Sequence, residues 1–317
     1  MKQKILITGG FGFVGSKLVE LLSKNTKYSI TIVDNLLSGN ALQYKFILAD
    51  VRDKAAMKRI VPKHDVIIHL AAIVGEPACI LDPNFAYNVN VGGTRNILDV
   101  MSDNQKIIFT STSSVYGNRP NERVTELSQP LPTNNYARHK YYAEMDIIEG
   151  SSNYIILRPV TAFGVTERTR MDLLVNSLIY EGLSYGRIKV YEPNIMRPII
   201  HVNDFARVLR AALEGDLGIN QVYNIGDSTY TMTKLQLAEQ IASLCGATIE
   251  HVDGSSLDLR NYDVSFDKLY KTGFVCGPAR LPMAVQQIKA VQYEVSKNME
   301  QYTTPYQVKQ FLAKDGK

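Results

Sequence analysis

Short apolar runs alternate with amphipathic segments along the first half of the chain. The apolar runs are rich in Ile and Val, and they lie at 4–8, 30–34, 46–50, 66–72, 106–112 and 154–160. Segments with helical periodicity separate several of them, at 13–24, 84–102 and 134–149. Continuous apolar strands that alternate with helices are typical of a parallel sheet covered on both faces. Because such crossovers are right-handed, the pattern predicts a Rossmann-type, doubly wound α/β fold.

The regular alternation ends after residue 165. Helices are expected at 171–183, at 203–213 with Asn203 as N-cap, and at 231–245. Short strands are expected at 187–192 and 198–202. We therefore predict a first domain over 1–165, to which 198–225 returns, and a smaller lobe formed mainly by 166–317.

Composition and charge narrow the class of protein. Of the 317 residues, 45% are hydrophobic and 21% charged, as in a globular protein, and the net charge of +4 includes no run of five basic residues. We therefore expect neither nucleic acid nor a membrane surface as a partner. Three scattered cysteines and five histidines without ligand spacing predict no disulfide framework and no metal site. The apolar stretch near the N-terminus is too short for a signal sequence, so a cytoplasmic protein is expected.

A glycine-rich turn follows the first apolar run. Gly9, Gly10, Gly12 and Gly15 lie between this strand and the helix expected at 13–24. Glycines at these spacings make a tight turn, let the backbone approach a pyrophosphate and allow close packing of helix on strand. The helix N-terminus then faces the phosphate charge. The strand–turn–helix context predicts a dinucleotide site.

An acidic residue ends the second strand. Asp34 lies 19 residues beyond Gly15, where a carboxylate accepts hydrogen bonds from a ribose 2′-hydroxyl and repels a 2′-phosphate. No arginine directly follows it, so NAD is favoured over NADP; the alternative is an aspartate that caps a turn. Asp50, at the end of the third strand, either contacts the adenine edge or caps a helix.

The helix at 134–149 carries a Tyr–Lys pair. Tyr136 and Lys140 are four residues apart and share one helix face. A tyrosine of pKa about 10 is a poor base at neutral pH, but a neighbouring ammonium favours its phenolate. The pair is thus a candidate general acid/base, the alternative being a solvated helix face. Residues 109–117 end the fifth strand with hydroxyl side chains, at the edge where doubly wound sheets bind ligands.

Taken together these motifs resemble the extended short-chain dehydrogenase/reductases. The resemblance rests on the glycine turn, Asp34, HLAA (69–72), VNVGGT (89–94), TSTSSVYG (110–117), the Tyr–Lys pair and LRPVTAFG (157–164). Within this class the chain looks like the NAD-dependent nucleotide-sugar epimerase/dehydratase branch, to which UDP-glucose 4-epimerase belongs. Residues 166–178 show a weaker resemblance to GDP-heptose 4-dehydrogenases.

The resemblance implies a set of site residues. It places catalysis on Thr112, Tyr136 and Lys140, and nucleotide-sugar binding on Asn176, Arg197 and Arg260. It places NAD on Gly9, Gly12, Phe13, Val14, Gly15, Asp34, Asn35, Asp50, Val51, Leu70, Ala71, Ala72 and Lys140. The first domain would then bind NAD, and the smaller lobe the nucleotide sugar.

The function implied is oxidation at C4 of a nucleotide-diphosphate sugar, with the 4-keto sugar either transient, as in an epimerase, or released, as in a 4-dehydrogenase. Related 4,6-dehydratases carry Asp-Glu after the catalytic Thr, where this chain has Ser113 and Ser114. A dehydratase is therefore a weaker alternative. Oxidation of a small non-nucleotide alcohol, or an NAD-binding sensor or scaffold without chemistry, are the others. The resemblance also implies a homodimer formed through 84–102 and 134–149.

Overall fold

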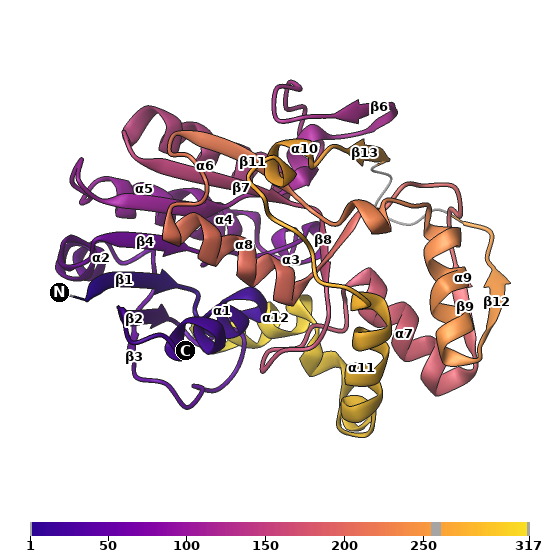
Figure 1. Cartoon of the computed structure of the whole chain (residues 1–317). Coiled ribbons are helices and arrows are strands. Elements are labelled where there is room, and N and C mark those ends of the chain that lie inside the picture. Colours follow the sequence, from indigo (N-terminus) through magenta and orange to yellow (C-terminus); the bar gives the residue numbers. More distant parts are fainter. Residues whose placement is uncertain (1, 255–260, 316–317) are drawn as a thin grey trace.

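The core of the molecule is one parallel sheet of seven strands. The computed structural model describes residues 2–254 and 261–315, and its main sheet has the strand order β3-β2-β1-β4-β5-β7-β11 (Figure 1). These strands are β1 (Gln3–Thr8), β2 (Tyr28–Asp34), β3 (Phe46–Leu48), β4 (Val66–His69), β5 (Lys106–Thr110), β7 (Tyr154–Pro159) and β11 (Gln221–Ile225). Strand order reverses direction between β1 and β4, which creates the crevice where such sheets bind ligands. The Rossmann-type prediction is confirmed.

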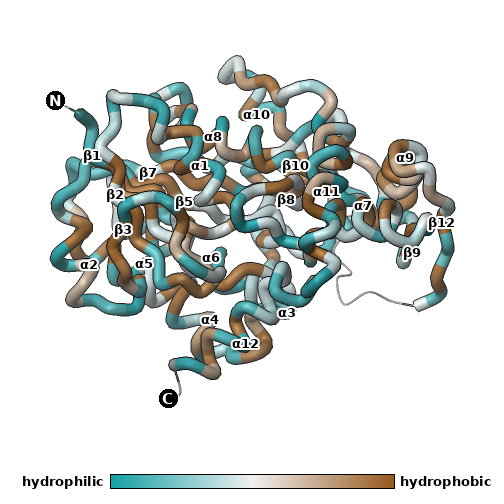
Figure 2. Tube along the Cα trace, turned by 90° about the horizontal axis from the view of Figure 1, so that it is seen from below, coloured by the Kyte–Doolittle hydropathy of each residue, from teal (hydrophilic) through white to brown (hydrophobic). Residues whose placement is uncertain are grey.

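Helices cover both faces of this sheet. Figure 2 shows α1 (Phe13–Ser23) and α8 (Val202–Glu214) on one side. The other side carries α2 (Lys54–Ile60), α4 (Pro83–Tyr87), α5 (Gly93–Leu98) and α6 (Asn135–Gly150). Each layer buries its own apolar cluster against the strands, with Leu18 and Leu209 in one and Met57 and Ile147 in the other. Both faces are thus buried, which explains the uninterrupted Ile and Val runs.

Several predicted boundaries differ from the structure. The helix expected at 84–102 contains a π-helical turn at Asn88–Gly92 and ends at Leu98. The amide of Asn90, in that turn, holds the chain after β4 by bonding both backbone groups of Ile73. Asn203 is not the N-cap of α8, because His201 Nδ1 accepts the Asn203 N–H and the helix begins at Val202. The strand expected at 66–72 ends at His69.

Residues beyond 198 rejoin the main sheet. Strand β10 (Ile199–His201) pairs with β8 (Thr161–Phe163), α8 packs on α1, and β11 pairs with β7.

The second lobe has its own apolar cluster. Helix α7 (Leu174–Tyr185), α9 (Lys234–Cys245) and α11 (Arg280–Lys297) pack beside strands β9 (Arg187–Val190) and β12 (Thr248–His251). Helix α9 begins later than expected because Thr233 and Gln236 form a capping box. Helix α11 was not predicted, and it contributes Ile288 to this cluster.

Further elements were not expected from the sequence. They are α3 (Glu76–Cys79), β6 (Arg119–Val124), β13 (Tyr262–Val264), α10 (Asp267–Tyr270), α12 (Thr304–Asp315) and the 3₁₀ turns Val61–Lys63, Ser113–Tyr116, Ser228–Tyr230 and Met299–Tyr302. The last helix, α12, packs against α3 and lies beside α4 in Figure 2. Within the described residues, no helix has the length and apolar character needed to cross a membrane.

Candidate active site

The glycine turn after β1 has steric requirements that explain two of its glycines. Gly9 has φ +69°, and a Cβ there would lie 2.7 Å from the Ala71 backbone. A Cβ on Gly15 would collide with the carbonyl oxygen of Gly9. A Cβ on Gly12, by contrast, would meet only that same oxygen, at 3.3 Å. The chain itself therefore does not require glycine at 12, and room for an approaching pyrophosphate does.

The other predicted NAD-binding positions surround this turn. Phe13 and Val14 begin α1, whose first backbone N–H groups face the turn. Leu70, Ala71 and Ala72 follow β4 and pass against Gly9, and the Leu70 N–H donates to the Thr8 carbonyl at 3.1 Å. Val51 packs under Gly93 of α5. These positions form a cradle at the carboxyl edge of the sheet that fits a dinucleotide.

Asp34 is buried at the end of β2. Its two carboxylate oxygens accept the N–H groups of Phe11 at 2.9 Å and Leu36 at 2.8 Å. Burial raises the pKa of Asp34, although these two bonds oppose the shift. One oxygen lone pair or more remains on each side for a ribose hydroxyl.

Asp50 has partners of its own. Its carboxylate accepts from Asn35 at 2.9 Å and from the Arg52 guanidinium at 2.9 and 3.0 Å. Burial would raise the pKa of Asp50, but the bonds from Arg52 outweigh burial and lower it. Asp50 does not cap α2, because Asp53 does so by accepting the Ala56 N–H. Of the two alternatives, helix capping is therefore wrong.

The three predicted catalytic residues lie on two neighbouring elements. Thr112 follows β5, and its hydroxyl accepts the Ser114 N–H at 3.1 Å and donates to the Ser114 hydroxyl at 2.9 Å. Tyr136 and Lys140 are one turn apart on the buried face of α6, with 9% and 3% exposure. The solvated-face alternative is therefore wrong for this pair.

Lys140 is a buried cation. Its Nζ lies 4.4 Å from the centroid of the Phe109 ring, at the end of β5. Burial lowers the pKa of Lys140 to about 7, and the Glu144 carboxylate one turn away partly offsets this effect. Both protonation states of this lysine are therefore accessible near neutral pH.

A buried network fixes α6 in place. Glu144 is fully buried and accepts from Arg158 of β7, with Nη2 at 2.6 Å. Arg158 also donates to the Tyr116 hydroxyl at 3.0 Å, which itself donates to Asn224 of β11 at 2.6 Å. The helix carrying the Tyr–Lys pair is thus tied to two strands of the sheet.

Glu76 contacts the start of the same helix. Its Oε2 accepts the backbone N–H of Tyr136 at 2.9 Å, a favourable place for a carboxylate because the helix N-terminus is positive. Nearby Cys79 is fully buried, and burial raises the pKa of its thiol to about 12. Cys79 is a packed residue, and Glu76 anchors the catalytic helix.

The predicted substrate residues lie in the second half of the chain. Asn176 is fully buried, and its amide bonds the backbone of Gly164 and the Arg170 carbonyl. These bonds fix the loop between β8 and α7. Arg197 is 6% exposed, and its Nη1 donates to the Met196 carbonyl at 3.0 Å. Arg260 lies outside the described residues.

The residues that follow position 260 connect the two halves of the site. Asn261 Oδ1 accepts the Met196 N–H at 3.0 Å, next to Arg197. The Tyr262 hydroxyl bonds the Ser113 hydroxyl at 3.1 Å, next to Thr112. Sequence reasoning missed Tyr262 and the anchoring role of Glu76, since neither falls in a motif and both act through contacts distant in sequence.

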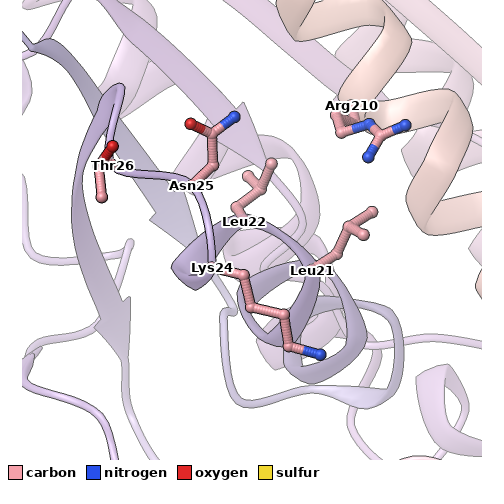
Figure 3. A pocket seen from close by; sticks show the side chains of 6 residues that line it. All are labelled: Leu21, Leu22, Lys24, Asn25, Thr26 and Arg210. Carbon is pink, nitrogen blue, oxygen red and sulfur yellow. The ribbon is translucent and has the colours of Figure 1, made fainter.

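A separate pocket lies at the other end of α1. Figure 3 shows it lined by Leu21, Leu22, Lys24, Asn25, Thr26 and Arg210. The glycine turn precedes the first residue of α1, whereas this pocket surrounds its last turn, so it is no part of the active site.

Comparison with known proteins identifies the family. The model of the NAD-dependent epimerase/dehydratase family matches residues 5–226, more than half of the chain. The chain belongs to this family. The predicted family, the enzyme class and NAD as cofactor are thereby confirmed, and the sensor or scaffold alternative loses its support.

Individual relatives agree with this assignment. A putative UDP-glucose 4-epimerase of Methanocaldococcus jannaschii is 31% identical over 242 residues, covering 72% of this chain and 78% of that protein. A UDP-N-acetyl-alpha-D-glucosaminuronate decarboxylase of Bacillus cytotoxicus is 27% identical over 95% of both chains. Among solved structures, the Thermotoga maritima UDP-glucose 4-epimerase with UDP-glucose has a TM-score of 0.81 and 25% identity, covering 91% of this chain and 99% of that one.

Proposed function

We propose that this enzyme oxidises the 4-hydroxyl of a nucleotide-diphosphate sugar and returns the hydride to C4, giving the 4-epimer. The observation that carries the proposal is the placement of Tyr136 and Lys140 on one buried helix face, beside the strand end that bears Thr112. The names of the relatives, which include UDP-sugar 4-epimerases and a decarboxylase, support a nucleotide sugar as substrate.

Each side chain has a defined task in this proposal. The Thr112 hydroxyl orients the substrate alcohol, and the Tyr136 phenolate removes its proton. The Lys140 ammonium stabilises the phenolate electrostatically. NAD, when bound, accepts the hydride that leaves C4. Tyr136 gives the proton back when the ketone is reduced.

The second lobe would bind the nucleotide diphosphate. Arg197 is a buried guanidinium suited to bidentate contact with a diphosphate, and Arg260 is proposed as its partner. Asn176 would act through the loop it holds. The hydrogen bonds of Asn261 and Tyr262 support a single site, because they link the neighbours of Arg197 and Thr112.

A 4-dehydrogenase that releases the ketone uses the same residues, and it is the second candidate because 166–178 resembles GDP-heptose 4-dehydrogenases. Elimination of water is disfavoured. The positions of the dehydratase acid and base are Ser113, bonded to Tyr262, and Ser114, bonded to Thr112. A serine hydroxyl is a poor proton donor for a leaving group at neutral pH.

The test is turnover of a panel of UDP-, GDP-, CDP- and dTDP-sugars by wild type and Tyr136→Phe. We expect the variant to lose at least about 10²-fold in kcat, the usual contribution of a general acid/base, with unchanged NAD affinity by calorimetry. Tyr142→Phe, an exposed tyrosine on the same helix, is the matched control and should retain full activity. Full turnover by Tyr136→Phe would overturn the assignment.

We also propose that the enzyme is a cytoplasmic homodimer whose subunits meet along α4–α5 and α6. The support is the resemblance to the family and the exposure of apolar side chains on α6, where Tyr142 is 45% and Ile148 37% exposed.

A further inference from the structure

An arginine from the second half of the chain approaches the ribose end of the NAD site. Arg168 lies in the loop between β8 and α7, 134 residues beyond Asp34. A Cβ built on Gly39, in the loop after β2, would lie 3.0 Å from Arg168 Nη1. The guanidinium therefore rests against the loop that follows Asp34, and its positive charge acts on that carboxylate.

The guanidinium of Arg168 lacks the partners that buried arginines normally have. Its Nε is buried and, within the described residues, accepts no protein hydrogen-bond partner. Arg170, two residues later, is by contrast paired with Asp172 at 2.8 Å. Burying a charged donor without a partner is unfavourable. A ligand with acceptor oxygens at this place would satisfy it.

The loop holds Arg168 in a defined position. The Arg168 N–H donates to the Thr166 hydroxyl at 3.0 Å, and the Thr166 N–H donates to the Thr169 hydroxyl at 3.1 Å. Asn176 bonds both ends of the loop, at Gly164 and Arg170. The arginine is therefore presented by an ordered segment.

We propose that Arg168 is a cofactor-binding residue contributed by the second lobe, which donates to the adenosine ribose of NAD beside Asp34. A carboxylate at this place accepts from a ribose 2′-hydroxyl, whereas an arginine accommodates a 2′-phosphate. Both groups are present here. Asp34 excludes the phosphate, and Arg168 is a latent 2′-phosphate ligand that the carboxylate masks.

The first measurement is NAD affinity by isothermal titration calorimetry on the full chain. Arg168→Ala should weaken NAD binding by about tenfold or more, the expected loss for a hydrogen bond from a charged donor. Glu167→Gln, the exposed neighbour, is the control and should stay within about twofold of wild type. Arg168→Lys should lie between, since it keeps the charge and loses the planar fork.

The second measurement is NADP affinity in a double-mutant cycle. Asp34→Ala should raise NADP affinity at least about tenfold by unmasking Arg168, and the Asp34→Ala/Arg168→Ala double variant should lose that gain. Two results would overturn the proposal. One is unchanged NAD binding by Arg168→Ala. The other is an NADP gain that persists in the double variant, which would mean that Arg168 only supports the loop.

Discussion

At the scale of single residues, Lys140 has the strongest dependence on pH. Burial lowers its pKa from 10.5 to about 7 in the folded protein. Between these two values the unfolded chain binds more protons than the folded one, so the stability of the fold rises with pH across this window. Below about pH 7 the full cost of burying the ammonium is present.

Lys140→Met should therefore stabilise the cofactor-free protein at pH 7. A gain on the order of a few kcal/mol in the free energy of unfolding is expected, and it should shrink toward zero as pH approaches 10.5. Urea denaturation followed by circular dichroism at pH 7, 8.5 and 10 measures it. The exposed Lys58→Met is the control and should show no such trend. A gain independent of pH would mean that methionine improves packing and that charge burial contributes little.

Residues inside a contiguous motif were predictable from the sequence, and residues that act across the chain were not. The Tyr136–Lys140 spacing places both side chains on one helix face whatever surrounds them. Arg168 reaches Asp34 only because the fold brings the second lobe to the end of β2. Asn203 was a reasonable N-cap by residue type, but the imidazole of His201 fills that role one turn position earlier.

At the scale of elements, the buried strands were predictable because both of their faces pack, which makes their apolar runs continuous. Strand β6 was not, because its sequence RPNERV is polar and most of it is exposed. It is a strand only through pairing with β13. Helices α11 and α12 were missed as well, and their place in the molecule depends on contacts with distant segments.

Helix α12 provides a test of such a contact. Val308 is fully buried in the same apolar cluster as Ala78 of α3 and Phe85 of α4. Val308→Ala should lower the free energy of unfolding by about 1–3 kcal/mol, from lost burial and the cavity left behind. Urea denaturation measures the change, and the exposed Lys309→Ala should stay within about 0.5 kcal/mol of wild type. Equal effects of the two variants would show that α12 contributes nothing to the fold.

At the scale of the whole molecule, the active site depends on segments from both halves. The NAD cradle and the Tyr–Lys helix come from the first 160 residues, whereas Arg197, Tyr262 and Arg168 come from the second half. The buried network from Glu144 to Asn224 also joins the two halves, because β11 is the last strand of the main sheet. Separating the chain near residue 165 would therefore remove part of the sheet as well as part of the site.

The proposed dimer follows from the outer surface of the same sheet. Helices α5 and α6 lie side by side, joined by the Arg95–Asp146 ion pair at 2.8 Å, and α6 exposes 45% of Tyr142. A twofold contact would bury this tyrosine against its symmetry mate. Analytical ultracentrifugation should thus give about twice the chain mass of 35.5 kDa for wild type, and Tyr142→Glu should shift the protein toward the monomer by burying unpaired charge at the contact. Tyr185→Glu alters another exposed tyrosine, on α7, and should leave the dimer intact. If wild type sediments as a monomer at micromolar concentration, α6 is not a subunit interface and Tyr142 simply faces solvent.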